Sequence, residues 1–297
     1  MKKLLVVAIL ALGFGCGIVE SKSSVTPPAK VISKGLKFCE GSVAYGTSLL
    51  VSNFGTDELD PLNTQGKGYI MKLTGDKTEV FIAADGNLSA PKGMAVSGEY
   101  LYIADVGKVV VYHLGITPAF HVAIPLPEGN LFVNDIVVSG TSAYISVTNT
   151  GKLFKLDISA PAKLSSANLS AYADIVGANG LLLNGKTLYV ASYPADGKTT
   201  AENVIYRITN IANPAVEKLF TRQGQYDGLA IKGDKLFFGN WEGPEIGYID
   251  LKDNRVTILP ITGVTLTGPA DISVTGNKLY IPNLPSSEVI EVDAKKL

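Results

Sequence analysis

Hydrophobic and polar positions alternate in short runs along most of the chain, and the runs recur as one unit. Each unit begins with a small polar stretch and continues with an apolar run, a short polar turn and a second apolar run. Alternation with a period of two is typical of half-buried strands. Six such paired segments lie at 40–54, 92–106, 134–149, 179–193, 227–241 and 270–284.

Further alternating runs follow each paired segment. A third run occurs in every unit, as at 68–73 and 246–251, and a fourth in the first five, as at 78–83. Four antiparallel strands in about 40–50 residues are typical of one propeller blade. No unit contains an amphipathic run of helical length, which argues against a helical solenoid. The pattern therefore predicts an all-β fold, a six-bladed β-propeller over 31–297.

The sixth unit ends after three strands, which would leave an open sheet edge. The segment before the first unit contains an apolar run that can fill this place. We therefore expect Val31 to Ser33 to pair with Glu288 to Asp293. This N-terminal strand would complete the last blade and close the ring.

The first fifteen residues have the features of a bacterial signal peptide, with a basic head and a short apolar run from Leu4 to Leu12. Cys16 follows small residues, an arrangement that resembles a lipoprotein signal. An ordinary secretory signal cleaved nearby is the alternative. We expect an exported protein of the periplasm or cell envelope, lipid-anchored at Cys16, with a flexible tether over 16–30. Cys39 would then be a buried free thiol.

The composition of the chain limits the classes of binding partner that we expect. The chain has 26 Lys and Arg against 27 Asp and Glu, a formal net charge of -1. Such a balance gives no basic surface for nucleic acid and no polybasic patch for anionic lipid. Two Cys and two His exclude a disulfide framework and a His-based metal cluster. We expect a monomer that takes a small-molecule substrate or ligand and contacts the membrane only through a lipid anchor.

The first strand of each propeller blade lines the central channel, so the positions that begin these strands form a ring at one mouth. Two carboxylates, two carboxamides and one amine occupy this ring: Glu40, Lys92, Asn134, Asn179, Asp227 and Ala270. The oxygen groups suit a hard cation such as Ca²⁺ or Mg²⁺. A water-filled channel whose polar residues bond one another is the alternative.

The second strand of each blade returns to the same mouth. Its last residues would form a rim around the polar centre, and a polar centre beneath aromatic groups is typical of a small-molecule site. The predicted rim consists of Phe54, Asp105, Asn149, Tyr193, Trp241 and Asn283.

Several short motifs at the ring positions resemble those of the senescence marker protein/gluconolactonase (regucalcin-like) family and, more distantly, the paraoxonases and strictosidine synthases. The resemblance covers about residues 30–297 and is carried by Glu40-Gly41, Asn134-Asp135-Ile136, Asn179-Gly180-Leu181 and Asp227-Gly228-Leu229.

The resemblance implies one divalent cation held by Glu40, Asn179 and Asp227, with Asn134 beside it or bound to it. Ca²⁺ is the first choice, and Mg²⁺, Mn²⁺ and Zn²⁺ are alternatives. In such a site the cation polarises a lactone carbonyl and Asp227 is the general base. The implied activity is metal-dependent hydrolysis of a lactone or related ester. A non-catalytic ligand-binding or scaffolding propeller with a structural cation is the main alternative, and a condensation like that of the strictosidine synthases is a third.

Two positions depart from these families. Phe132 stands where gluconolactonases often have a sugar-binding Arg, and Lys92 stands where paraoxonases have a catalytic His. Two arrangements of Lys92 are open. Its ammonium could replace the cation between Glu40 and Asp227, or it could lean toward Asp105 or Asp135 and present its amine to an anionic substrate. The charge balance favours the second, and Lys92 then joins Asp227 and Asn134 as a catalytic candidate.

Overall fold

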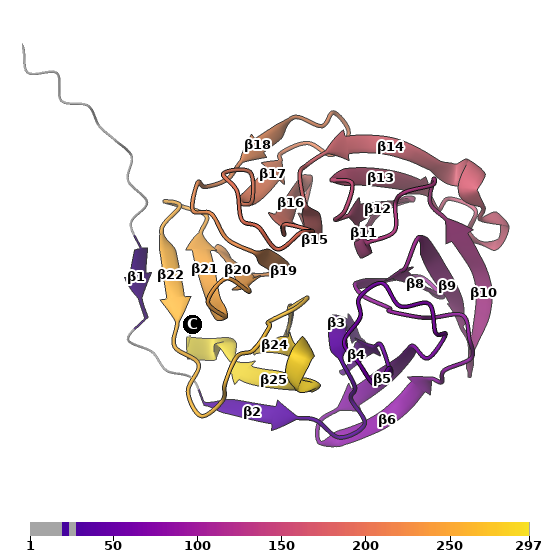
Figure 1. The fold of residues 1–297 in the computed structure, drawn as a ribbon, viewed down its shortest axis with the longest axis horizontal. Coiled ribbons are helices and arrows are strands. Elements are labelled where there is room, and N and C mark those ends of the chain that lie inside the picture. The colour runs from indigo at the N-terminus through magenta and orange to yellow at the C-terminus, as the bar shows by residue number, and fades with distance from the viewer. Residues whose placement is uncertain (1–19, 24–27, 297) are drawn as a thin grey trace, which may run out of the picture.

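The computed structural model describes residues 20–23 and 28–296, and within them the chain forms six sheets arranged around a central axis (Figure 1). The predicted six-bladed, all-β propeller with four antiparallel strands per blade is confirmed. The predicted signal peptide and the lipidation site Cys16 lie outside the described residues.

Each of the first five blades is built from four consecutive strands, numbered outward from the axis. Blade one contains β3 (Cys39–Tyr45), β4 (Ser48–Asn53), β5 (Tyr69–Thr74) and β6 (Lys77–Ile82). Blade two contains β7 (Met94–Ser97), β8 (Tyr100–Asp105), β9 (Lys108–Leu114) and β10 (Pro118–Pro125). Blade three contains β11 (Val133–Ser139), β12 (Ser142–Val147), β13 (Lys152–Asp157) and β14 (Leu169–Asp174).

The second half of the chain repeats this plan. Blade four contains β15 (Ala178–Asn184), β16 (Thr187–Ser192), β17 (Ile205–Ile208) and β18 (Val216–Lys218). Blade five contains β19 (Tyr226–Lys232), β20 (Lys235–Asn240), β21 (Glu245–Asp250) and β22 (Val256–Leu259). Blade six contains β23 (Ser273–Thr275), β24 (Lys278–Asn283), β25 (Glu288–Asp293) and, from the start of the chain, β2 (Ala29–Ile32).

The described helices are four 3-10 turns of three residues each: η1 (Pro161–Lys163), η2 (Ser166–Asn168), η3 (Leu284–Ser286) and η4 (Ala294–Lys296). Across the described ranges, none of the helices has the length and apolar character needed to cross a membrane.

Strand β2 closes the ring as the sequence predicts. It pairs antiparallel with β25, with Val31 opposite Ile290 and Ile32 opposite Val289. The strand covers Ala29–Ile32 rather than 31–33, a shift of two residues at its start. The first and last segments of the propeller are therefore joined within one sheet, and the edge left by three C-terminal strands is covered.

A further strand, β1 (Glu20–Lys22), lies along the outer edge of blade five and pairs parallel with β22. It falls within the range predicted as a flexible tether, so this part of the tether is docked. Glu20 also forms an ion pair with Arg222, whose Nε lies 3.4 Å from the carboxylate. The chain thus runs along blade five before it enters blade six as β2 (Figure 1).

The apolar core is divided among the interfaces between blades. Between blades two and three, for example, Tyr102 and Val111 pack in one cluster with Ile145 and Phe154. Equivalent clusters fill the other five interfaces. Cys39, predicted as a buried free thiol, is buried in the cluster between blades six and one. Because each sheet is covered on both faces, the first strands are held in fixed positions around the axis.

Candidate functional site

The ring positions coincide with breaks in the strand register. In blades one, three, four and five, the pairing of the first strand with the second shifts at the two residues that begin each predicted motif. A bulge of this kind re-aims a side chain and is common beside active sites. The four shifts fall at Glu40-Gly41, Asn134-Asp135, Asn179-Gly180 and Asp227-Gly228.

Glycine follows several ring residues because the inner strands approach closely there. A Cβ atom added to Gly180 would lie 2.1 Å from the backbone oxygen of Asp227, and one on Gly41 would lie 2.3 Å from that of Lys92. No larger residue fits without moving the neighbouring strand. The glycines of the motifs that carry the family resemblance therefore meet a packing requirement between neighbouring first strands.

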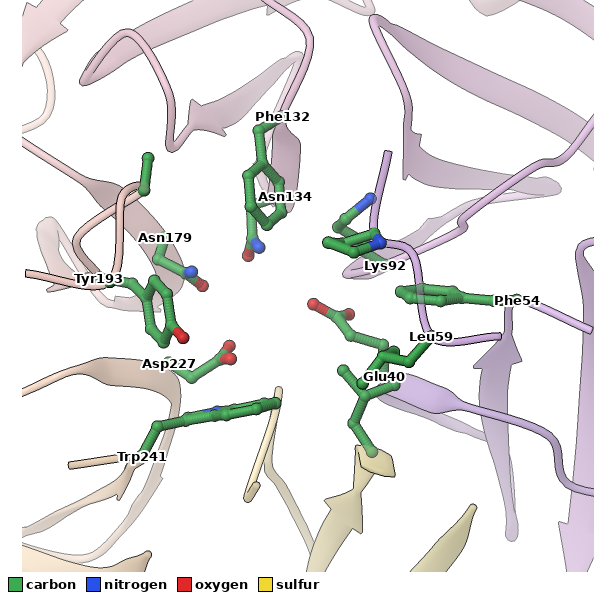
Figure 2. A pocket seen from close by; sticks show the side chains of 14 residues that line it. Glu40, Phe54, Leu59, Lys92, Phe132, Asn134, Asn179, Tyr193, Asp227 and Trp241 are labelled. Carbon is green, nitrogen blue, oxygen red and sulfur yellow. The ribbon is translucent and has the colours of Figure 1, made fainter. Parts of the chain in front are cut away.

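The four oxygen-bearing ring residues come together at one pocket. Figure 2 shows the carboxylates of Glu40 and Asp227 and the amides of Asn134 and Asn179 pointing into a shared space. The cavity has a volume of about 230 Å³. Most of the other residues that line the cavity are apolar or aromatic, and they form its wall. These residues are Phe54, Leu59, Pro61, Lys92, Phe132, Tyr193, Ala195, Gly197, Trp241 and Leu284.

The four oxygen-bearing side chains form the polar floor of this pocket, and they are buried without all of their hydrogen-bond partners. Glu40, Asn134, Asn179 and Asp227 are each no more than 5% exposed, and each has a buried oxygen without a hydrogen-bond partner. The buried indole Nε1 of Trp241 also has none. Together these are five of the seven such side-chain atoms in the described part of the chain. Buried polar groups are normally bonded, so these atoms need partners from outside the protein chain, whether a cation, an organic ligand or water.

Burial also raises the affinity of the carboxylates for positive charge. Burial, with the Asp227 charge, raises the pKa of Glu40 well above its ordinary value, while Lys92 opposes the rise. Burial raises the pKa of Asp227 to about 7; Asp135 adds to this effect, and the Trp241 indole and Lys92 oppose it. The Lys92 charge offsets the rise in both pKa values only in part, and a bound cation would lower both pKa values further.

The donor set fits a hard cation. The described residues contain no group of three or more His, Cys, Asp and Glu side chains placed to hold a metal. The set here instead has two carboxylates and two carboxamides, with their unpaired oxygens turned to one cavity. Oxygen-only ligands of this kind match Ca²⁺, and to a lesser degree Mg²⁺, better than softer metals.

Lys92 lines the same cavity, where its amine is turned away from any direct ion pair with the described residues. Its side chain is buried, and its Nζ donates a hydrogen bond to the backbone oxygen of Ala90 at 2.8 Å. The ammonium lies 5.4 Å from the ring centre of Phe54 and 5.2 Å from that of Phe132. In the described residues it forms no ion pair, with Asp105, Asp135 or any other carboxylate. Two aromatic faces hold this charge in place.

Three predicted rim residues line the cavity, and three do not. Phe54, Tyr193 and Trp241 form its aromatic wall, and the rings of Tyr193 and Trp241 meet edge to face at 5.9 Å. Asp105, Asn149 and Asn283 are absent from the lining. Their side chains accept hydrogen bonds from loop N–H groups instead, which corrects the prediction that these three residues face the site.

This second set of polar residues has a shared structural role. At the end of the second strand, an Asn or Asp oxygen accepts a backbone N–H from the loop that leads into the same blade's first strand. The Asp105 carboxylate, for instance, accepts the N–H of Ser89 and of Ala90, and the Asn149 side chain accepts that of Phe132. The loop-pinning residues are Asn53, Asp105, Asn149, Asn240 and Asn283.

Five lining residues were not identified from the sequence, and two of them, Ala195 and Gly197, lie in the connection between β16 and β17. Leu59 and Pro61 come from the long connection between β4 and β5, and Leu284 begins η3. The unusual length of that connection was the available signal, because long loops in compact domains are often functional. Phe132, noted only as a departure from a family pattern, is a wall of the cavity and a partner of Lys92.

A separate hollow lies beside Asp135 and Asp271, lined also by Ser42 and other residues of the first strands. The Asp135 carboxylate accepts N–H groups of Ile136 and Leu181 at 2.7 and 2.6 Å. Burial raises the pKa of Asp271 well above its ordinary value, and the Asp135 charge adds to the rise. Acidic groups therefore extend beyond the pocket of Figure 2.

Comparison with known proteins places the chain among β-propellers. A model of the LVIVD repeat matches residues 91–111 and 132–168, in blades two and three. No curated protein matches the chain.

Solved structures share the fold at low identity. A structure titled as a nidogen/laminin complex is 14% identical, covers 78% of this chain and 87% of its own, and has a TM-score of 0.60. A streptogramin B lyase is 13% identical, with coverages of 89% and 97% and a TM-score of 0.59. A virginiamycin B lyase from Staphylococcus aureus, solved with quinupristin, is 12% identical, with coverages of 89% and 99% and a TM-score of 0.57. These neighbours include both lyases and a binding propeller, and the likeness extends to the fold alone.

Proposed function

We propose that this chain binds one divalent cation, Ca²⁺ first, and uses the loaded pocket to hydrolyse a lactone or related ester. The observation that carries the proposal is the set of four buried, unpaired oxygens on Glu40, Asn134, Asn179 and Asp227. The resemblance of the ring motifs to gluconolactonases supports the reaction class. The aromatic wall supports a small organic ligand.

When bound, the cation would supply a Lewis acid for the carbonyl oxygen of the substrate. Asp227 would accept a proton from the attacking water, whose oxygen forms a bond to the carbonyl carbon. The single bond between the carbonyl carbon and the alkoxy oxygen then breaks, and the proton passes to the leaving alkoxide. A lactone gives a hydroxy acid, and an open-chain ester gives an acid and an alcohol. The Asn134 amide would donate to the oxygen that gains negative charge, and Lys92 would place positive charge nearby.

The test is a panel of lactones and aryl esters assayed with EDTA-treated protein, then with Ca²⁺, Mg²⁺, Mn²⁺ or Zn²⁺ added. We expect hydrolysis that depends on a divalent cation and falls at least a hundredfold in Asp227→Asn, because one ligand charge and the base are both removed. Asp174→Asn is the matched control, since this exposed carboxylate pairs with Lys152 on the outer strand of blade three. It should keep full activity.

The alternative of a binding propeller makes a different prediction. It requires cation binding, measured by atomic emission on dialysed protein, with no turnover of any substrate in the panel. Hydrolysis that survives both EDTA and Asp227→Asn would contradict the cation-dependent mechanism itself. Export to the cell envelope and lipid anchoring at Cys16 remain part of the proposal, and Cys16→Ser should release the protein to the soluble fraction.

A further inference from the structure

Lys92 is a buried basic residue that forms no direct ion pair among the described residues. Its side chain is 1% exposed, and it is the only basic residue among those that line the cavity. An ammonium group carries three N–H donors, and Ala90 accepts the one hydrogen bond that Nζ forms. The rings of Phe54 and Phe132 stabilise the charge but accept no conventional hydrogen bond. Donor capacity therefore remains at the cavity surface.

The charged residues that line the cavity are Glu40, Asp227 and Lys92. Glu40 and Asp227 together carry two negative charges, and the divalent cation of the proposed function would balance them. Among the residues that line the cavity, Lys92 is then the charged group left without a partner, since Asp135 and Asp271 lie in the separate hollow. A buried cationic group is costly unless an acceptor or an anion accompanies it. Asp105, one of the carboxylates considered as its partner, already contacts Lys108 and accepts two backbone N–H groups.

The wall of the cavity indicates the rest of the ligand. Phe54, Phe132, Tyr193 and Trp241 surround the space above the polar floor, as Figure 2 shows. Apart from Lys92, the wall offers two donors, the hydroxyl of Tyr193 and the buried indole N–H of Trp241, which lies close to Asp227. A ligand rich in hydroxyl groups would leave many of its own polar groups against these rings, whereas a flat apolar body would not.

We propose that the pocket selects a small monoanionic carboxylate with an aromatic body. One carboxylate oxygen accepts from Lys92 Nζ, the ring packs within the aromatic wall, and the Trp241 N–H donates to a further oxygen of the ligand. This inference rests on the proposed cation site for its charge balance. It deepens that proposal, because the hydrolysis of a lactone or an ester releases such a carboxylate.

The experiment uses Trp241 as its reporter, because it is the only tryptophan of the chain. Phenylacetate is titrated into the calcium-loaded protein while tryptophan fluorescence is recorded. Phenylacetamide is the neutral control of the same shape, and gluconate is the carboxylate control without an aromatic ring. We expect a saturable change with phenylacetate, and binding at least tenfold weaker for either control.

Two variants assign the effect to Lys92. Lys92→Met should weaken phenylacetate binding at least tenfold and leave phenylacetamide unchanged. Phe132→Leu removes one ring face from the ammonium but keeps the charge, so its affinity for phenylacetate should fall by less than that of Lys92→Met. It also provides the test if Lys92→Met does not fold.

Cation binding is measured separately, by terbium luminescence sensitised through Trp241 and by calcium competition. If the cation binds but phenylacetate and phenylacetamide bind alike, the inference is overturned and the cation site stands. The same holds if Lys92→Met keeps its preference for the carboxylate. If carboxylate binding depends on Lys92 although no cation binds, the proposed hydrolase fails and the Lys92 assignment stands.

Discussion

Two sets of Asn and acidic residues lie at equivalent places in several blades, and their hydrogen bonding separates them. The loop-pinning residues at the ends of the second strands have their oxygens filled by backbone N–H groups, as at Asp105 and Asn283. The ring residues at the starts of the first strands have oxygens with no partner, as at Asn179 and Asp227. Asp105, Asn283, Asn179 and Asp227 are alike in residue type and burial, so hydrogen bonding distinguishes the loop-pinning residues from the proposed ligands.

The difference has an energetic meaning. A buried oxygen that fixes two loop N–H groups contributes to stability, and its loss leaves those donors unsatisfied. A buried oxygen without a partner opposes folding, so its presence needs another explanation, such as a bound cation. Substitutions in the two sets should therefore change stability in opposite directions.

The largest effect is expected at Asp105. Its carboxylate is fully buried, accepts from Ser89 and Ala90, and lies 3.5 Å from the Lys108 ammonium. Asp105→Ala removes all three partners at once, and we expect a loss of about 3 kcal/mol in the free energy of unfolding, measured in urea.

Asp105→Asn is the matched control, because four other blades use Asn at this place. This variant keeps an acceptor for the loop N–H groups, so its free energy of unfolding should fall by less than half as much as that of Asp105→Ala. Equal losses in the two variants would mean that charge, rather than the loop hydrogen bonds, explains the role of Asp105.

The second effect is smaller and opposite in sign. Asp227→Asn removes an unpaired buried charge near Asp135, so in EDTA we expect the variant to match the parent or to be stabilised by about 1 kcal/mol. Saturating calcium should stabilise the parent, by about 2.7 kcal/mol at a hundredfold excess over Kd, and should stabilise the variant far less. Thermal unfolding in EDTA measures the effect of the substitution itself, and thermal unfolding in calcium measures the stabilisation by the cation.

A clear loss of stability for Asp227→Asn in EDTA would show that its carboxylate already has a partner in the cation-free protein. The comparison between the two sets would then fail at its most informative residue.

The sequence predicts the fold well because the repeat is a pattern of burial. Alternation locates the strands, and the missing fourth strand of the last unit requires closure by the N-terminal segment, which β2 supplies. The convergence of Glu40, Asn134, Asn179 and Asp227 also follows from equivalent places in equivalent blades. Such inferences need only topology.

The direction of an individual side chain was less accessible. Asn149 and Tyr193 both end a second strand, yet Asn149 turns toward the loop and Tyr193 faces the cavity. An amide can accept the loop N–H and a phenyl ring cannot, so chemistry separates the two positions, but alternation alone does not. The position of Lys92 between two rings depends on Phe132, which comes from a different blade. Contacts of that kind are absent from any single repeat.

The smallest effect is expected at Asn149, and it tests the correction to the rim. The residue is exposed, and its side chain accepts from Phe132 N–H at 2.9 Å and donates to Gly129 at 2.7 Å. Water can replace both bonds, so Asn149→Ala should lose about 1 kcal/mol or less. Because Asn149 does not line the cavity, the response of Trp241 fluorescence to ligand should stay within twofold of the parent. Tyr193→Ala is the contrasting variant, since it removes a ring from the wall itself and should weaken ligand binding at least tenfold. Similar losses of affinity in both variants would return Asn149 to the binding surface and would weaken the distinction between bonded and unbonded polar groups on which the site assignment depends.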